Sequence, residues 1–117
     1  EVFGNLRCDG LIVSTPTGST AHSLSASGPV VFPDMECMLL VPVAPHSISW
    51  RPVIVPSNEI LSLSVSPEGV VIIDGQREID VGYSDRVVIK KAKKGVKIID
   101  DDNGFFSKLK TKFHWGN

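Results

Sequence analysis

The sequence lacks several features that define whole classes of protein. No apolar run approaches the roughly 18 to 20 residues that a membrane-spanning helix needs. Cysteine is scarce, because Cys8 and Cys37 are the only two, and their separation of 29 positions fits neither a metal-ligand spacing nor a dense disulfide framework. We therefore expect two buried free thiols in a reducing cytoplasm, no metal site in this chain and no membrane partner.

The chain also lacks a recognisable start. Its first residues, Glu1-Val2-Phe3-Gly4, are neither an initiator methionine nor a charged-then-apolar secretion signal, so we expect them to lie inside a longer protein. The 117 residues are enough for one modest domain with a core of its own. With 42% hydrophobic and 21% charged residues, that domain has the composition of a folded globular protein rather than a disordered one.

Positive charge is scarce in most of the chain and concentrated at its end. Residues 1–85 hold three basic and ten acidic residues, whereas residues 86–117 hold nine basic and three acidic ones. A basic end occurs in proteins that bind nucleic acid or anionic lipid. Here five lysines between Lys90 and Lys97 flank Gly95 between two apolar runs, and no aromatic stacking platform accompanies them. We therefore expect a hairpin edge blunted by lysine, and no nucleic-acid partner.

Beyond residue 37 the apolar residues recur with a period of two. The clearest run, Leu61-Ser62-Leu63-Ser64-Val65-Ser66, places three aliphatic side chains on one sheet face and three serines on the other. Turn signals separate the runs, and Asp74-Gly75 is typical of a type I′ hairpin. Many short strands at this spacing predict a mainly β fold, an antiparallel sandwich or barrel, and we take the β-sandwich as the fold class. The other expected strands are 11–13, 38–43, 53–55, 70–73, 78–81, 86–91 and 96–99.

Two segments break the β pattern. Residues 18–27, at the end of a Thr-Pro-Thr-Gly-Ser-Thr loop, predict a short helix closed by Gly28-Pro29, although five of the ten are Ser or Thr and favour a helix poorly. At the end of the chain, Phe105, Leu109 and Phe113 form the apolar stripe of an expected carboxy-terminal amphipathic helix. Residues 1–103 would then form a β domain that is incomplete at its start, and residues 104–117 a closing segment that another surface must cover.

The segment from Asp9 to Ala21 carries the most chemical information. A buried strand runs into a loop of small hydroxylated residues, and the loop opens the expected helix. Small side chains would let a polar ligand approach the backbone, where free N–H groups and hydroxyls would bind it. Alternatively, the segment is a strand-to-helix turn with Thr15 or Thr17 as the N-cap and nothing bound. It is not a Walker P-loop, because Gly18 is followed by serine rather than lysine.

This segment, Asp9-Gly10-Leu11-Ile12-Val13-Ser14-Thr15-Pro16-Thr17-Gly18-Ser19-Thr20-Ala21 followed by Ser25-Ala26 and Gly28-Pro29, resembles the signature of NAD kinases. These enzymes phosphorylate the 2′-hydroxyl of the adenosine ribose of NAD to make NADP. Three further segments match in the family's order: Pro42–Ser47 with Arg51-Pro52, Asp74–Gln76, and Phe105–Trp115. The resemblance covers nearly the whole chain, and the first block is its specific part.

The resemblance implies an NAD site with two halves. The adenosine half would lie along the turn that follows the signature loop, and the nicotinamide-ribose half would meet two charged residues before the first strand, often on a neighbouring subunit. A small residue and a glutamine would add contacts. The residues so implied are Arg7, Asp9, Thr20, Ala21, His22, Ser23, Leu24, Ser25, Ala44 and Gln76. The family usually has tyrosine where this chain has His22, so a ring stack there would be weaker or depend on pH.

The family's catalytic motifs are absent from the sequence. Phosphoryl transfer there depends on a Gly-Gly-Asp-Gly motif in an amino-terminal α/β domain and on an Asn-Glu pair after it, whereas Asp9-Gly10 and Asp74-Gly75 lack the preceding glycines. The resemblance therefore implies that ATP or polyphosphate, with Mg²⁺ or another divalent metal, binds through a domain not present here. We expect no catalytic residue in this chain, no turnover by the chain alone, and a closing segment that packs on that domain. The family also implies a homo-oligomer, a dimer or tetramer.

Other functions fit parts of the pattern. A non-catalytic nucleotide-binding or regulatory β module would share the polar loop, but would not prefer adenosine-containing dinucleotides. The β domain of a lipid kinase of similar build lacks the Thr-Pro-Thr-Gly-Ser-Thr-Ala run. A purely structural interaction domain leaves the hydroxyl-rich loop unexplained.

Overall fold

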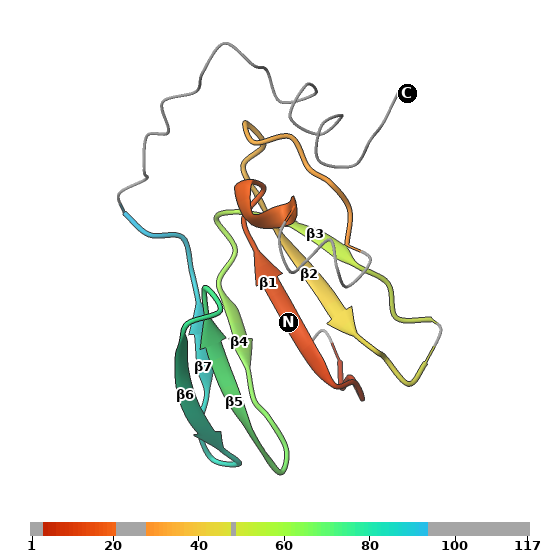
Figure 1. Cartoon of the computed structure of the whole chain (residues 1–117), viewed down its shortest axis with the longest axis vertical. Coiled ribbons are helices and arrows are strands. Elements are labelled where there is room, and N and C mark those ends of the chain that lie inside the picture. Colours follow the sequence, from red (N-terminus) through yellow and green to blue (C-terminus); the bar gives the residue numbers. More distant parts are fainter. Residues whose placement is uncertain (1–3, 21–27, 48, 94–117) are drawn as a thin grey trace.

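The computed structural model describes residues 4–20, 28–47 and 49–93, and these form an antiparallel β structure (Figure 1). Every strand pair in it is antiparallel, which confirms the mainly β prediction. No described helix is long and apolar enough to cross a membrane. The elements are β1 (Gly10–Ser14), the 3-10 turn η1 (Thr17–Thr20), β2 (Cys37–Val43), β3 (Val53–Pro56), β4 (Leu61–Leu63), β5 (Glu68–Ile73), β6 (Arg77–Gly82) and β7 (Val87–Ile89).

The best-packed part is a three-stranded sheet with β2 in the centre. Strand β1 pairs with one edge of β2, from Gly10 with Val43 to Ser14 with Leu39, and β3 pairs with the other edge. Because β2 has a neighbour on both sides, Leu39 and Val41 are completely buried. They form the core with Val31 and Cys37, and Ile12 of β1 packs against it.

A proline inside the central strand is tolerated because of where β3 ends. The Val43 carbonyl accepts a hydrogen bond from the Asp9 N–H at 2.9 Å, so Val43 directs its backbone polar groups toward β1. Its neighbour Pro42 faces the opposite edge, since consecutive strand residues bond to opposite sides. Pairing with β3 extends only to Leu40 with Val53, so the N–H that proline lacks has no ladder partner to lose.

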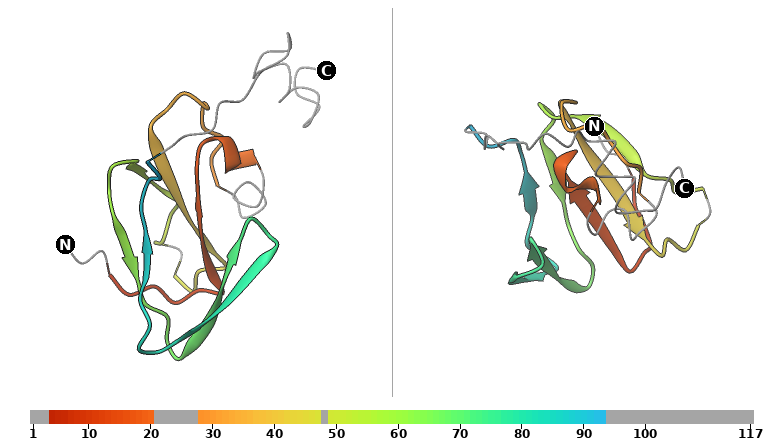
Figure 2. Two further views of the ribbon diagram at one scale, coloured as in Figure 1. Left: turned by 90° about the vertical axis from the view of Figure 1, so that its left-hand side faces the viewer. Right: turned by 45° about the horizontal axis from the view of Figure 1, so that its top comes forward.

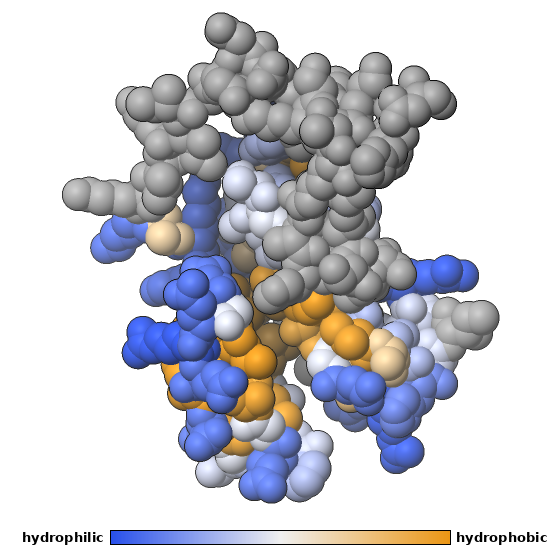
Figure 3. Space-filling model, in the orientation of Figure 1, coloured by the Kyte–Doolittle hydropathy of each residue, from blue (hydrophilic) through white to orange (hydrophobic). Residues whose placement is uncertain are grey.

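The remaining strands form two separate pairs, β4 with β7 and β5 with β6, which lie together beside the three-stranded sheet (Figures 1 and 2). The predicted alternation around β4 is confirmed, because Leu61, Leu63 and Val65 are half-buried while the serines between and after them are exposed. The β5–β6 hairpin is barely covered: Val70 and Ile72 are 48% and 55% exposed. Figure 3 shows apolar residues reaching the surface there among hydrophilic ones.

Several predicted boundaries are wrong by a few residues. Strand β4 stops at Leu63 rather than Ser66, because its partner β7 is only three residues long, and β7 is itself shorter than the expected 86–91. Strand β5 begins at Glu68 rather than at the expected residue 70. Of the expected helix over 18–27, the structure describes the 3-10 turn Thr17–Thr20; residues 21–27 lie outside the described part, as do the expected strand 96–99 and the closing helix. Three separate sheets leave the two-layered sandwich a prediction.

Candidate functional site

Four of the expected site residues, Arg7, Asp9, Ala44 and Thr20, lie near the two ends of β1, and the first end brings three of them together. The Arg7 carbonyl accepts a hydrogen bond from the His46 N–H at 2.9 Å, while Asp9 is tied to Val43. Ala44, directly after β2, therefore lies beside the Arg7–Asp9 segment. It has a positive φ of 48°, which is costly for a residue with a side chain and is held by these flanking bonds. The side chains of Arg7 and Asp9 are exposed, as is Ala44, and within the described residues neither charge forms an ion pair.

The other end of β1 opens into the hydroxyl-rich loop, residues 14–20. The Gly18 N–H donates a hydrogen bond to Thr15 Oγ1 at 3.2 Å, so Thr15 caps the turn η1. The capping interpretation of Thr15 is thus confirmed, and its hydroxyl is occupied by backbone. Thr20 is the last residue of η1, while the expected adenosine contacts from Ala21 to Ser25 lie outside the described residues.

Gln76 lies in the turn of the β5–β6 hairpin, on a different sheet. Its N–H donates to the Ile73 carbonyl at 3.1 Å, and Asp74 and Gly75 have φ values of 53° and 71°, the positive values that a type I′ turn requires. The ladder pairs Ile73 with Arg77, so Gln76 is an additional residue at the turn, with an exposed side chain. The hairpin prediction is therefore confirmed, whereas the ligand contact of Gln76 stays a prediction.

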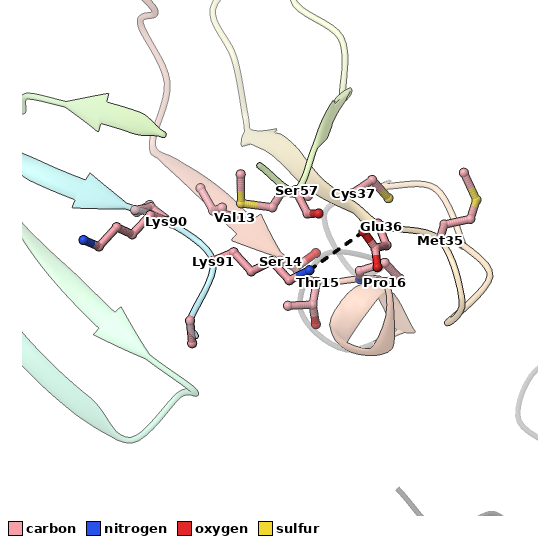
Figure 4. A pocket seen from close by; sticks show the side chains of 13 residues that line it. Val13, Ser14, Thr15, Pro16, Met35, Glu36, Cys37, Ser57, Lys90 and Lys91 are labelled. Atoms are coloured by element: carbon pink, nitrogen blue, oxygen red, sulfur yellow. Dashed lines mark ion pairs between the residues drawn. The ribbon is translucent and has the colours of Figure 1, made fainter. Parts of the chain in front are cut away.

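A cavity of about 340 Å³ lies between the hydroxyl-rich loop, the start of β2 and the end of β7 (Figure 4). We call it the Ser14 cavity, because the Ser14 Oγ in its wall is buried and has no hydrogen-bond partner among the described residues. Most of its lining is apolar, which favours an organic ligand over free water. The lining residues are Val13, Ser14, Thr15, Pro16, Met35, Glu36, Cys37, Met38, Ser57, Ile89, Lys90, Lys91 and Ala92.

The charged side of this cavity could not be recognised from the sequence. Lys91 Nζ lies 3.8 Å from Glu36 Oε2, so the end of β7 is joined to the segment before β2. Lys91 extends toward the hydroxyl-rich loop, whereas Lys90 points the opposite way (Figure 4). Glu36 and Lys91 are 55 positions apart, and no local pattern connects them. The lysines were predicted to edge a hairpin around Gly95; its turn and second strand lie outside the described residues.

The described residues offer little to a metal ion. They bring together no group of three or more His, Cys, Asp or Glu side chains placed to hold one. The second cavity, about 620 Å³ beside β5 and β6, is lined by Glu68, Asp80 and Asp85, but Asp85 Oδ2 already accepts the Gly82 N–H at 2.7 Å in a turn. Both cysteines are free, as expected, although Cys8 is only half-buried while Cys37 is buried.

Comparisons with known proteins agree with this fold and loop. Residues 1–100 match the family model of the ATP-NAD kinase C-terminal domain. The chain is 40% identical over 121 residues to the NAD kinase of Lachnoclostridium phytofermentans, covering 97% of this chain and 42% of that protein. It is 42% identical over 117 residues to the NAD kinase of Helicobacter hepaticus, covering 99% of this chain and 39% of that protein. The chain therefore spans about two fifths of the length of these curated relatives.

Solved structures give the same result. An NAD kinase from Archaeoglobus fulgidus in complex with ATP aligns with a TM-score of 0.70 at 38% identity, over 75% of this chain and 34% of that one. Yeast NADH kinase complexed with NADH aligns with a TM-score of 0.60 at 40% identity, over 66% of this chain and 24% of that one. Since the family model matches most of the sequence, the chain belongs to the ATP-NAD kinase family, within the region of its carboxy-terminal domain.

Proposed function

We propose that this chain is the NAD-binding part of an NAD kinase, which transfers a phosphoryl group from ATP or polyphosphate to the 2′-hydroxyl of the adenosine ribose of NAD. The observation that carries the proposal is the family match over residues 1–100, which includes the hydroxyl-rich loop. The structure of that loop is compatible with it: small residues leave β1 in a turn capped by Thr15, and Gly18 has no side chain to keep a ligand from the backbone.

In this proposal the two ends of β1 serve the two halves of the dinucleotide. Thr20 and the residues from Ala21 to Ser25 would line the adenosine half, while Arg7, Asp9 and Ala44 would meet the nicotinamide-ribose half. Asp9 and Thr15 are separated by six residues of extended chain, about 20 Å. The family resemblance implies a homo-oligomer, a dimer or tetramer, in which Arg7 and Asp9 of one subunit would reach the ligand held by a neighbour's loop. Gln76 would then approach the ligand from its own hairpin.

The remaining parts of the reaction would come from the rest of the parent protein. The sequence has no Gly-Gly-Asp-Gly motif, so the donor and the base that acts on the ribose hydroxyl are assigned to an amino-terminal α/β domain. The described residues hold no group suited to Mg²⁺, so in this proposal the metal ion would bind with the donor on that domain. Residues 1–103 would complete a β-sandwich with the short helix after the loop, and the closing helix of residues 104–117 would pack on the missing domain. A cytoplasmic location is part of the same proposal.

Equilibrium binding tests this assignment. The 117-residue chain is titrated with NAD and with nicotinamide mononucleotide, which lacks the adenosine half, and NAD should bind at least about tenfold more tightly. Thr20→Val removes a hydroxyl from the proposed contact and should weaken NAD binding about tenfold, because it removes one hydrogen bond to the ligand. Thr17→Val, the same change three residues earlier in η1, is the matched control and should leave NAD binding unchanged.

The proposal would be wrong if the chain does not bind NAD while circular dichroism shows that its sheets are intact. Equal losses of NAD affinity in the two threonine variants would show that Thr20 has no specific contact with the ligand. A turnover assay adds a second criterion: the chain with ATP and Mg²⁺ should form no NADP, and any NADP above background would contradict the assignment of the catalytic groups to another domain.

A further inference from the structure

The hydroxyl-rich loop has no cation of its own. Between residues 8 and 20 there is neither lysine nor arginine, and the position after Gly18 is serine. Phosphate-binding loops combine backbone N–H groups with a lysine or arginine, because charge-assisted hydrogen bonds to phosphate are about twice as strong as neutral ones. Hydroxyl groups alone can orient a phosphorylated ligand, but they do not neutralise the negative charge of its phosphate.

The fold places a lysine at this loop from far along the chain. Strand β7 ends at Ile89, and the residues after it, Lys90 to Ala92, line the Ser14 cavity together with Ser14, Thr15 and Pro16. Lys91 extends over the cavity toward the loop, while Lys90 points away (Figure 4). The alternation of side chains along an extended segment explains this division between neighbours. Lys91 is therefore the cation that the loop's own sequence lacks.

The present partner of Lys91 is easily exchanged. Its ammonium group lies 3.8 Å from Glu36 Oε2, at the outer limit of an ion pair, and the two side chains are 58% and 80% exposed. Exposed pairs of this kind contribute about 0 to 1 kcal/mol, so a doubly charged phosphate can replace the carboxylate at small cost. An anion at this position would compete with the Glu36 carboxylate for Lys91.

The cavity wall supplies a second, independent observation. The Ser14 Oγ is buried without a hydrogen-bond partner among the described residues, whereas the neighbouring Thr15 hydroxyl already caps η1. A buried hydroxyl in that state is available to a polar atom of a ligand. The volume of about 340 Å³ is in the range of small-ligand sites.

We propose that Lys91, with the Ser14 cavity beside it, binds a phosphate group of the ligand held by the hydroxyl-rich loop, and that Glu36 competes with that phosphate. The phosphate belongs to the pyrophosphate of the dinucleotide or to the polyphosphate of the phosphoryl donor. Only the identity of the ligand rests on the proposed NAD kinase function; the anion site stands on the geometry.

Calorimetric titration of the 117-residue chain with inorganic pyrophosphate at fixed ionic strength tests the site. Lys91→Gln should weaken pyrophosphate binding about tenfold, the effect of losing one charge-assisted hydrogen bond. Lys90→Gln removes the same charge from a neighbour whose ammonium group points away from the loop (Figure 4), and should change the affinity less than about twofold. Glu36→Gln should strengthen binding severalfold, and Lys91→Arg should retain it. Far-ultraviolet circular dichroism verifies that each variant keeps its sheets.

Equal weakening by the Lys90 and Lys91 substitutions would overturn the proposal, because it would indicate only a diffuse positive surface. No pyrophosphate binding by the folded wild-type chain would overturn it as well. Titrations with NAD and with ATP identify the source, since the nucleotide whose affinity falls with Lys91→Gln supplies the phosphate. If the wild-type chain binds pyrophosphate through Lys91 but binds neither nucleotide, the NAD kinase assignment fails and the anion site remains.

Discussion

The three-stranded sheet and the β5–β6 hairpin contain the same types of aliphatic residue, but these side chains are buried in the sheet and largely exposed in the hairpin. In the sheet, Leu39 and Val41 are completely buried, since β2 has a strand on both edges and Val31 and Ile12 pack in the same cluster. In the hairpin each strand has one partner, and Val81 is the only described hydrophobic residue there that is buried. Burial therefore follows the number of neighbouring strands rather than the residue type.

The two proposed parts of the site therefore start from regions that are packed to different degrees. The hydroxyl-rich loop leaves β1, the strand that pairs with β2 over its full length, so the proposed adenosine contacts start from the best-packed part of the molecule. Gln76 instead lies at the tip of the exposed hairpin. Sites that begin on packed elements are held more accurately than sites on weakly covered ones. We expect the loop to be oriented within the chain itself and the hairpin to depend on whatever covers its apolar residues.

A pair of identical valine substitutions gives the largest expected contrast. Val41→Ala removes buried methyl groups from the core and should lower the free energy of unfolding by about 2 to 3 kcal/mol, from the lost transfer energy and the remaining void. Val70→Ala, at a side chain that is 48% exposed, should cost about 0.5 kcal/mol. Urea unfolding followed by circular dichroism measures both. Similar losses of unfolding free energy in the two variants would show that the hairpin is buried in solution, for instance in an oligomer. The proposed difference between the sheet and the hairpin would then be wrong.

A second contrast lies inside the less-covered region, at Gly69. A Cβ atom there would lie 2.8 Å from Val65 Cγ1, closer than two carbon atoms can approach, whereas at Gly82 the nearest atom is Asp85 Oδ2 at 3.5 Å. Gly69→Ala should therefore destabilise the fold by about 1 to 3 kcal/mol, and Gly82→Ala by less than about 0.5 kcal/mol.

Combining Gly69→Ala with Val65→Ala removes the obstructing methyl group, so the double variant should be more stable than the sum of the single losses implies. The same urea unfolding experiment decides this. Additive losses would mean that the close approach of residues 65 and 69 is not what limits the side chain at this position.

The sequence predicted those features that depend on short-range pattern. Period-two alternation located the six strands from β2 to β7 within a few residues, and Asp74-Gly75 located the hairpin, because a turn with two positive φ values selects those residue types. It predicted the length of β4 poorly, since the alternation continues to Ser66 while pairing stops with β7. Strand length is set by the partner, which local pattern does not contain.

Site residues divide in the same way. The hydroxyl-rich loop and the Arg7–Asp9 segment are contiguous in sequence, and their resemblance to a known signature made them visible. The ion pair of Lys91 with Glu36 and the burial of Ser14 Oγ depend on β7 lying near the start of β2, so only the three-dimensional structure reveals them. Both lysines after β7 looked equivalent in the sequence, and their opposite directions distinguish them.

The smallest expected effect compares two neighbouring hydroxyls at the end of β1. Thr15 Oγ1 accepts the Gly18 N–H at 3.2 Å, so Thr15→Ala should lower the free energy of unfolding by about 1 kcal/mol, the usual cost of losing a cap. Ser14 Oγ is buried without a partner among the described residues, so Ser14→Ala should leave stability unchanged or raise it by up to about 1 kcal/mol. Urea unfolding of the two variants in the absence of ligand checks this order. A clear loss on Ser14→Ala would mean that this hydroxyl has a structural partner outside the described residues, and it would then no longer be available to a bound phosphate.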